Sequence, residues 1–172
     1  MLPIELPPEL LTPSQEVHAH ATELLEQHFR LYAIDLTLYF PSMVDSQQLQ
    51  HFFDWMQRTA WQHHMVGYVI TYQSYYLAGG RVRGIVYLLP SAMTENWYVA
   101  LIAYLMQHLP GTELRDFSYE PTPVHIRTTQ DMALLRARLT VLMLRPSGIP
   151  ISHWCWNCSL EQLQQIYDSM RA

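Results

Sequence analysis

Residues 32–40 read YAIDLTLYF, and this stretch decides the fold prediction. Its side chains fall into two alternating sets: Tyr32, Ile34, Leu36, Leu38 and Phe40 on one side, and Ala33, Asp35, Thr37 and Tyr39 on the other. Successive side chains of an extended chain point to opposite faces, so an apolar set alternating with a more polar set predicts a half-buried strand. Pro41 ends the strand, because proline has no backbone N–H for a sheet.

Helix signals lie on both sides of this strand. Three capping boxes predict helix starts: Thr12 with Gln15, Asp45 with Gln48, and Ser159 with Gln162. Apolar periodicity extends the predicted helices over residues 12–29, 45–64, 94–109, 128–144 and 159–170. Tyrosines and β-branched residues predict strands over 66–77 and 81–89, joined by a turn at 78–80. Residues 115–126 are expected to hold one or two short strands.

The central order is therefore strand, helix, strand, strand, helix, strand. This order predicts an α+β fold with a ferredoxin-like split βαβ core, in which an antiparallel sheet has its helices on one face. Extra helices are expected at the N- and C-terminal ends. Residues 1–11 are proline-rich and predict an extended arm, and residues 12–172 predict a single domain.

The amino-acid composition excludes some classes of function and favours others. Charged residues make up 15% of the 172-residue chain, and all ten basic residues are arginine. Without lysine, Schiff-base and P-loop chemistry are excluded. A surface poor in charge favours a protein partner or self-association, whereas the net charge of −5 counts against nonspecific binding of nucleic acid. No long apolar run or signal peptide is present, so we expect a cytoplasmic protein without a membrane partner.

Two cysteines form a CxxC motif close to the C-terminal end, in the sequence His153-Trp154-Cys155-Trp156-Asn157-Cys158. Cys155 and Cys158 with His153 and a distant His125 would suit tetrahedral zinc. A CxxC before a helix also suits thiol redox chemistry. The third interpretation, two buried cysteines in an aromatic cluster, involves no cofactor.

Tyrosines gather in the two central strands. Tyr68 and Tyr72 share one strand face, and with Arg81, Arg83 and Tyr87 they predict a platform that could stack bases and hold phosphates. The alternative is ordinary aromatic packing between neighbouring strands.

Residues 32–146 resemble the inovirus-type replication proteins, a branch of the HUH endonucleases. The resemblance rests on the opening strand 34–41, the Phe52-Phe53 pair, the segment 66–69 and the Gly-Gly turn into the next strand. In that family this next strand carries a His-hydrophobic-His metal site, and a later helix carries a nucleophilic tyrosine. Here the strand reads Arg81-Val82-Arg83, and the helix over 130–144 has no tyrosine. Arginine stays protonated and does not bind metal, so the resemblance implies a sheet without the nickase chemistry.

We therefore expect a protein that is not an enzyme. The first hypothesis is a binding or regulatory protein of a bacterial phage, plasmid or other mobile element, acting through protein–protein contacts. The second is a DNA-binding protein derived from a degenerate HUH replication protein, using Arg81 and Arg83. The third is a zinc- or thiol-dependent protein centred on Cys155 and Cys158.

Overall fold

The computed structural model describes residues 12–75, 79–115, 122–144 and 151–171. Its elements, in chain order, are α1 (Pro13–His28), β1 (Arg30–Phe40), α2 (Ser46–Thr59), the 3₁₀ helix η2 (Ala60–His63), β2 (Met65–Tyr75), β3 (Gly79–Leu88), α3 (Thr94–His108), β4 (Glu113–Arg115), β5 (Val124–His125), α4 (Thr129–Leu142), β6 (Ser152–Asn157) and α5 (Leu160–Met170). An α+β fold is therefore confirmed. The proline-rich arm 1–11, residues 76 and 77 of the predicted strand 66–77, and residue 78 of the predicted turn lie outside the described residues.

One antiparallel sheet forms the centre of the fold. Its strand order is β4-β1-β3-β2-β6, and the short β5 pairs with the beginning of β1. The register places Thr37 of β1 between Arg115 of β4 and Arg83 of β3. Arg83 in turn lies opposite Thr71 of β2. Directly opposed residues point to the same side of a sheet, so this register decides which side chains share a face.

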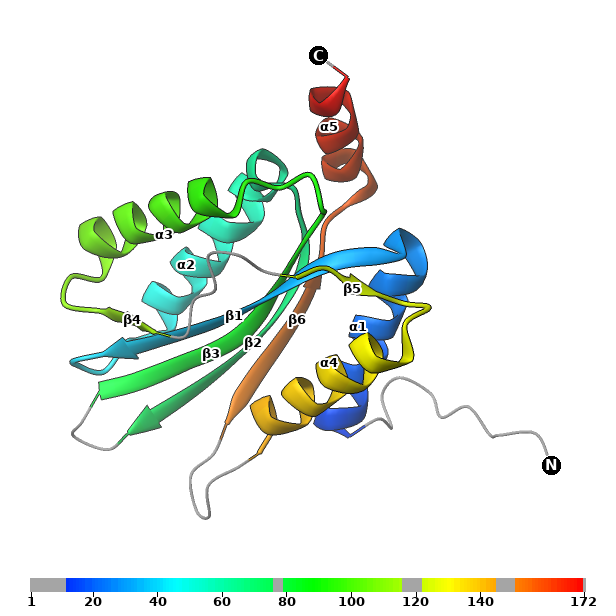
Figure 1. Ribbon diagram of the computed structural model, residues 1–172. Helices are drawn as coiled ribbons and strands as arrows, with labels where there is room; N and C mark the ends of the chain where they lie inside the picture. Colours follow the sequence, from blue (N-terminus) through cyan, green and yellow to red (C-terminus); the bar gives the residue numbers. More distant parts are fainter. Residues whose placement is uncertain (1–11, 76–78, 116–121, 145–150, 172) are drawn as a thin grey trace.

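Helices α2 and α3 cover one face of the sheet (Figure 1). The first apolar set of β1 points to this side, because Ile34, Leu36 and Leu38 are buried against both helices. Trp97 of α3 and Phe52 of α2 are among the large side chains that are fully buried there. Burying this apolar area provides the main favourable free energy of folding.

Helices α1 and α4 lie on the opposite face (Figure 1). They bury Leu31 and Ala33 of β1 together with Ile85 and Tyr87 of β3. The two helices of the predicted core, α2 and α3, thus share one face of the sheet, and two of the additional helices, α1 and α4, cover part of the other. The physical reason is that β1 and β3 each carry apolar residues on both faces over part of their length, and the terminal helices shield the second face there.

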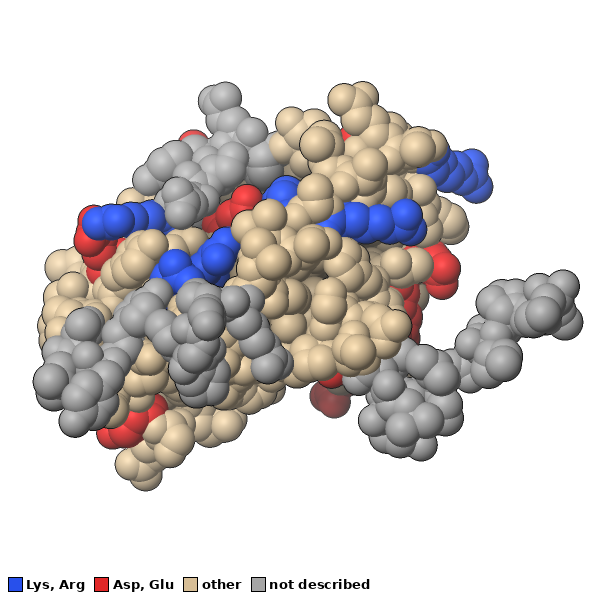
Figure 2. Space-filling model, turned by 90° about the horizontal axis from the view of Figure 1, so that it is seen from below, with Lys and Arg blue, Asp and Glu red and all other residues tan. Residues whose placement is uncertain are grey.

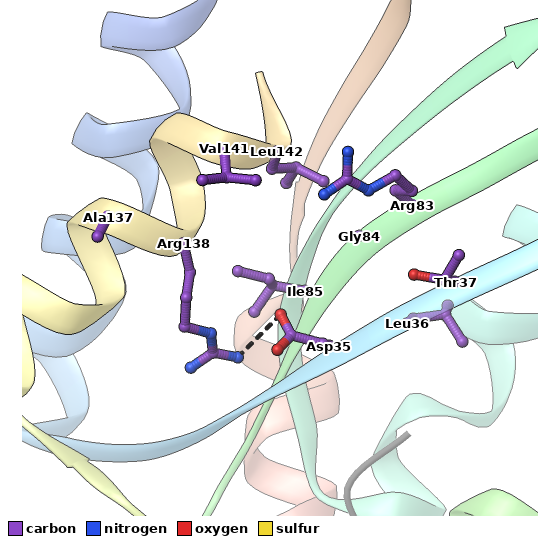
Figure 3. A pocket seen from close by; sticks show the side chains of 10 residues that line it. All are labelled: Asp35, Leu36, Thr37, Arg83, Gly84, Ile85, Ala137, Arg138, Val141 and Leu142. Atoms are coloured by element: carbon purple, nitrogen blue, oxygen red, sulfur yellow. Dashed lines mark ion pairs between the residues drawn. The ribbon is translucent and has the colours of Figure 1, made fainter. Parts of the chain in front are cut away.

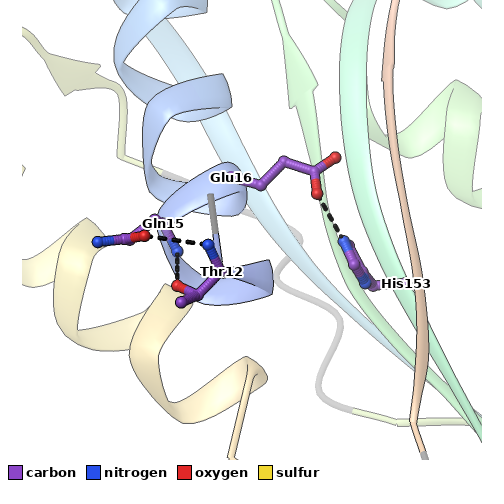
Figure 4. Close-up of polar contacts among 4 residues, drawn as sticks. All are labelled: Thr12, Gln15, Glu16 and His153. Carbon is purple, nitrogen blue, oxygen red and sulfur yellow. Dashed lines mark hydrogen bonds and ion pairs between the residues drawn. The ribbon is translucent and has the colours of Figure 1, made fainter. Parts of the chain in front are cut away.

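The three predicted capping boxes are all present. At the start of α1, the Gln15 N–H donates to Thr12 Oγ1 at 3.2 Å, and the Thr12 N–H donates to Gln15 Oε1 at 3.0 Å (Figure 4). Helix α4 begins differently, because Thr128 makes no side-chain cap. Asp131 instead accepts a hydrogen bond from the backbone N–H of His125, which ties the helix to β5.

Strand β6 was not predicted, and it extends the sheet beyond β2. Its side chains alternate, with Trp154 and Trp156 on the α2 side. Trp154 contacts Phe53 at a ring-centroid distance of 4.8 Å, and Trp156 stacks on Tyr68 at 5.3 Å. The expectation of an aromatic cluster near the C-terminal end thus corresponds to a paired strand. None of the helices in the described residues has the length and apolar character needed to cross a lipid bilayer.

Candidate anion-binding site

The second face of the sheet changes from apolar to polar along β1 and β3. Beside α4 and beyond it, β1 presents Asp35, Thr37 and Tyr39, and β3 presents Arg83 and Arg81. Arg83 lies opposite Thr37, and Arg81 lies opposite Tyr39. Both arginines are partly exposed. The structure therefore brings the two predicted arginines together on one side of the central strand.

The edge strand β4 adds a third arginine to this face. Arg115 lies opposite Thr37, and its guanidinium forms an ion pair of 2.9 Å with Glu113. The same guanidinium lies 4.7 Å from the ring centroid of Tyr39, a distance at which a cation is attracted to an aromatic face. Arg81 donates from Nη2 to Gln73 Oε1 at 2.9 Å. These contacts hold the outer part of the face in a defined arrangement.

A cavity of about 430 Å³ lies where α4 crosses this face (Figure 3). Its floor is formed by β1 and β3, and its wall by the last two turns of α4. The lining residues are Asp35, Leu36, Thr37, Arg83, Gly84, Ile85, Ala137, Arg138, Val141 and Leu142. A second hollow of about 540 Å³ lies beside it and shares Asp35, Ala137 and Arg138 with it.

The charges in this cavity are unequal. Arg138 reaches down from α4 to Asp35, where Nη2 lies 3.0 Å from Oδ1 and also donates to the Ala33 carbonyl at 2.6 Å. Asp35 is the only carboxylate among the described residues that line the cavity. The guanidinium of Arg83 extends toward the last turn of α4 (Figure 3) and forms no hydrogen bond or ion pair with any described residue. Among the described lining residues, the cavity thus contains one positive charge that is not compensated.

Seen from the α4 side, arginine side chains gather across the middle of the molecule, with acidic side chains beside some of them (Figure 2). Four arginines belong to this face: Arg81, Arg83, Arg115 and Arg138. Asp35 and Glu113 compensate two of them. Arg83 adds a positive charge that no described carboxylate pairs, in a chain whose net charge is −5. An anion is the natural complement of such a surface.

The predicted tyrosine platform is not assembled. Tyr68 is buried on the α2 side, where Gln57 donates a hydrogen bond to its hydroxyl, and Tyr72 packs on that same side against Phe40. Tyr87 lies on the arginine side but is fully buried beneath the terminal helices. Tyr68 and Tyr87 are therefore core residues and Tyr72 is a partly buried residue packed against the core, as in the alternative interpretation of packing between strands. Among the described residues, Tyr39 is an aromatic side chain that lies beside the arginines, in contact with Arg115.

The cysteine motif does not form a metal centre in the described residues. Cys155 and Cys158 are unpaired thiols packed at the edge of the α1 and α4 core. Burial raises the pKa of Cys155 to about 12 and also raises that of Cys158, which disfavours the thiolate that zinc binding and redox chemistry require. His153 Nε2 lies 3.0 Å from Oε2 of Glu16 in α1 (Figure 4). No group of three or more His, Cys, Asp or Glu side chains suited to a metal occurs in the described part of the chain.

Four charged or aromatic residues of the site were not predicted: Asp35, Tyr39, Arg115 and Arg138. Tyr39 could have been found, because it shares the polar set of the opening strand with Asp35 and Thr37. Arg115 and Arg138 carry no such signal, because β4 and α4 reach the face only through tertiary packing.

Comparisons with known proteins leave the site to be interpreted from its own chemistry. No family model matches this chain, no curated protein matches it, and no solved structure matches it.

Proposed function

We propose that this protein is a non-catalytic binding protein that holds single-stranded nucleic acid on the arginine-bearing face of its sheet. The observation that carries the proposal is the placement of Arg81 and Arg83 side by side with Arg115 and Arg138, with Arg83 unpaired among the described residues. Phosphate contacts from arginine provide most of the affinity of nonspecific nucleic-acid binding. Tyr39 offers a partly exposed aromatic ring next to them.

The strand order supports a relation to the fold expected from the sequence. We propose that β1-α2-β2-β3-α3-β4 is a ferredoxin-like split βαβ unit, to which β5, β6 and the remaining helices are additions. The order β4-β1-β3-β2 is the arrangement such a unit has. In this proposal the chain derives from an HUH-type replication protein, and Arg81 and Arg83 stand where that family carries its metal-binding histidines.

Binding of fluorescein-labelled oligothymidylate, followed by anisotropy at several salt concentrations, tests the proposal. The variant Arg81→Gln/Arg83→Gln should bind more weakly. The slope of log K against log salt should become less negative by about 1.4, because each phosphate contact on a single strand contributes about 0.7. The control is Arg136→Gln, an exposed arginine of α4 that lines none of the cavities described above. Binding that is absent, or equally affected by both variants, would refute the proposal.

A second candidate function, contact with a protein partner or a second copy of the chain, is favoured by α3. Its outer side exposes Val99 and Met106, which are 64% and 73% accessible. Exposed apolar groups that are clustered mark interaction surfaces. Sedimentation velocity of the protein and of Met106→Glu tests this candidate, since an assembly through α3 should dissociate in the variant.

A further inference from the structure

We infer that the cavity between α4 and strands β1 and β3 binds one nucleotide unit of the strand, with its phosphodiester at the Arg83 guanidinium and its sugar and base against α4. This inference rests on the proposed function and specifies where on the arginine face the ligand is held. It assigns a role to Asp35, which the proposed function does not use.

The charge of the cavity matches a phosphodiester. Arg138 and Asp35 neutralise each other at 3.0 Å, which leaves the single positive charge of Arg83. A phosphodiester carries one negative charge, whereas a terminal phosphate monoester carries nearly two. Arg83 lies on a central strand and is only partly exposed, so water compensates its charge less well than at an open surface. A bidentate contact with two phosphate oxygens would satisfy the guanidinium.

The wall of the cavity matches the rest of a nucleotide. Val141 is 49% accessible and stands with Ala137 beside the polar floor. A sugar and a base present apolar surfaces that would cover these side chains, whereas a short acidic side chain would leave Val141 exposed. The volume of about 430 Å³ lies within the usual range for small-ligand sites.

The position of Arg81 extends the same arrangement by one unit. Arg81 and Arg83 are two residues apart on β3, so their Cα atoms are separated by about 6.7 Å. This separation is comparable to one step between phosphates of an extended single strand. Arg83 would therefore hold the phosphate in the cavity, and Arg81 lies at the spacing of the next one along the strand.

The dinucleoside monophosphate TpT, which has a single phosphodiester, is a suitable probe. Methyl NMR of the whole chain would follow Val141 and Leu142 during a titration. We expect these methyl signals to shift in the native protein and the affinity to fall at least about tenfold in Arg83→Gln, because a charged hydrogen bond is lost. Asp35→Asn frees Arg138 and raises the cavity charge by one, so TpT should bind about twofold to fivefold more tightly.

Arg136→Gln is the matched control, since it removes the same charge from an exposed position on the same helix. If oligothymidylate binds through Arg81 but TpT leaves Val141 and Leu142 unchanged, the cavity inference is overturned and the proposed function stands. If neither oligothymidylate nor TpT binds, both the proposed function and the cavity inference are overturned. Equal effects of Arg83→Gln and Arg136→Gln on TpT affinity would also overturn the inference. If a short glutamate peptide binds more strongly than TpT and shifts the same methyl signals, the nucleotide inference is overturned and the ligand of the cavity is an acidic peptide.

Discussion

The replacement Tyr87→Phe is expected to stabilise this protein. Tyr87 lies on the central strand β3 and is fully buried, and its hydroxyl has no hydrogen-bond partner among the described residues. Burial raises the pKa of Tyr87 well above its usual value, so the group stays protonated. A buried polar group without a partner costs about 1–3 kcal/mol. Removing the oxygen while keeping the ring should therefore increase the unfolding free energy by roughly 1 kcal/mol or more.

Tyr68→Phe is the matched control. Tyr68 is equally buried on the neighbouring strand β2, but its hydroxyl accepts a hydrogen bond from Gln57 Nε2 at 2.9 Å. Tyr68→Phe removes this hydrogen bond and should therefore lower the unfolding free energy by about 1 kcal/mol. Urea unfolding followed by circular dichroism measures both variants, and opposite signs are expected. For a chain of this length, 1 kcal/mol corresponds to about 2–4 °C in Tm. If Tyr87→Phe destabilises as much as Tyr68→Phe, the reasoning about an unsatisfied hydroxyl is refuted.

Two further predictions concern titratable groups that are buried on the side of the sheet covered by α1 and α4. Because the pKa of Cys155 is raised to about 12, only about one thiol in ten thousand is ionised at pH 8. Iodoacetamide should therefore alkylate Cys155 far more slowly in the native protein than in urea, and equal rates would contradict the burial argument. Burial lowers the pKa of His20 despite the opposing Trp156 carbonyl, so the unfolded chain takes up a proton at higher pH than the folded one. The unfolding free energy should fall as the pH drops below about 6.5, and His20→Gln should flatten that dependence; an unchanged slope would exclude His20 as its source.

Local patterns were sufficient to predict most of the elements. The three capping boxes begin helices where their spacing indicated, because a cap satisfies backbone N–H groups within four residues of chain. The alternation in residues 32–40 predicted β1 and its two faces for the same local reason. Strand β6 was missed because its six residues lie between a proline-containing segment and a helix start. Its stability comes from pairing with β2 and from the stacking of Trp156 on Tyr68.

The candidate site depended on contacts that are distant in the sequence. Arg81 and Arg83 were predicted, because their spacing alone places them on one side of a strand. The tyrosines grouped with them were assigned to the wrong surroundings, since the sequence does not say which face of β2 packs on α2. Arg138 lies 103 positions from Asp35 in the chain, and only the packing of α4 across the sheet brings the two together at 3.0 Å.

By itself the sequence determined the local properties of this protein: where helices begin, which side chains alternate on β1 and β3, and the absence of lysine chemistry. Each depends on interactions within a few residues, which periodicity and capping report directly. The tertiary structure alone decided that α1 and α4 cover part of the second face, that β6 extends the sheet, and that Asp35 forms an ion pair with Arg138. Those outcomes depend on which helices and strands pack against each other. The same local sequence pattern is compatible with more than one such packing arrangement. That no described residue pairs the charge of Arg83 is therefore a property of the fold.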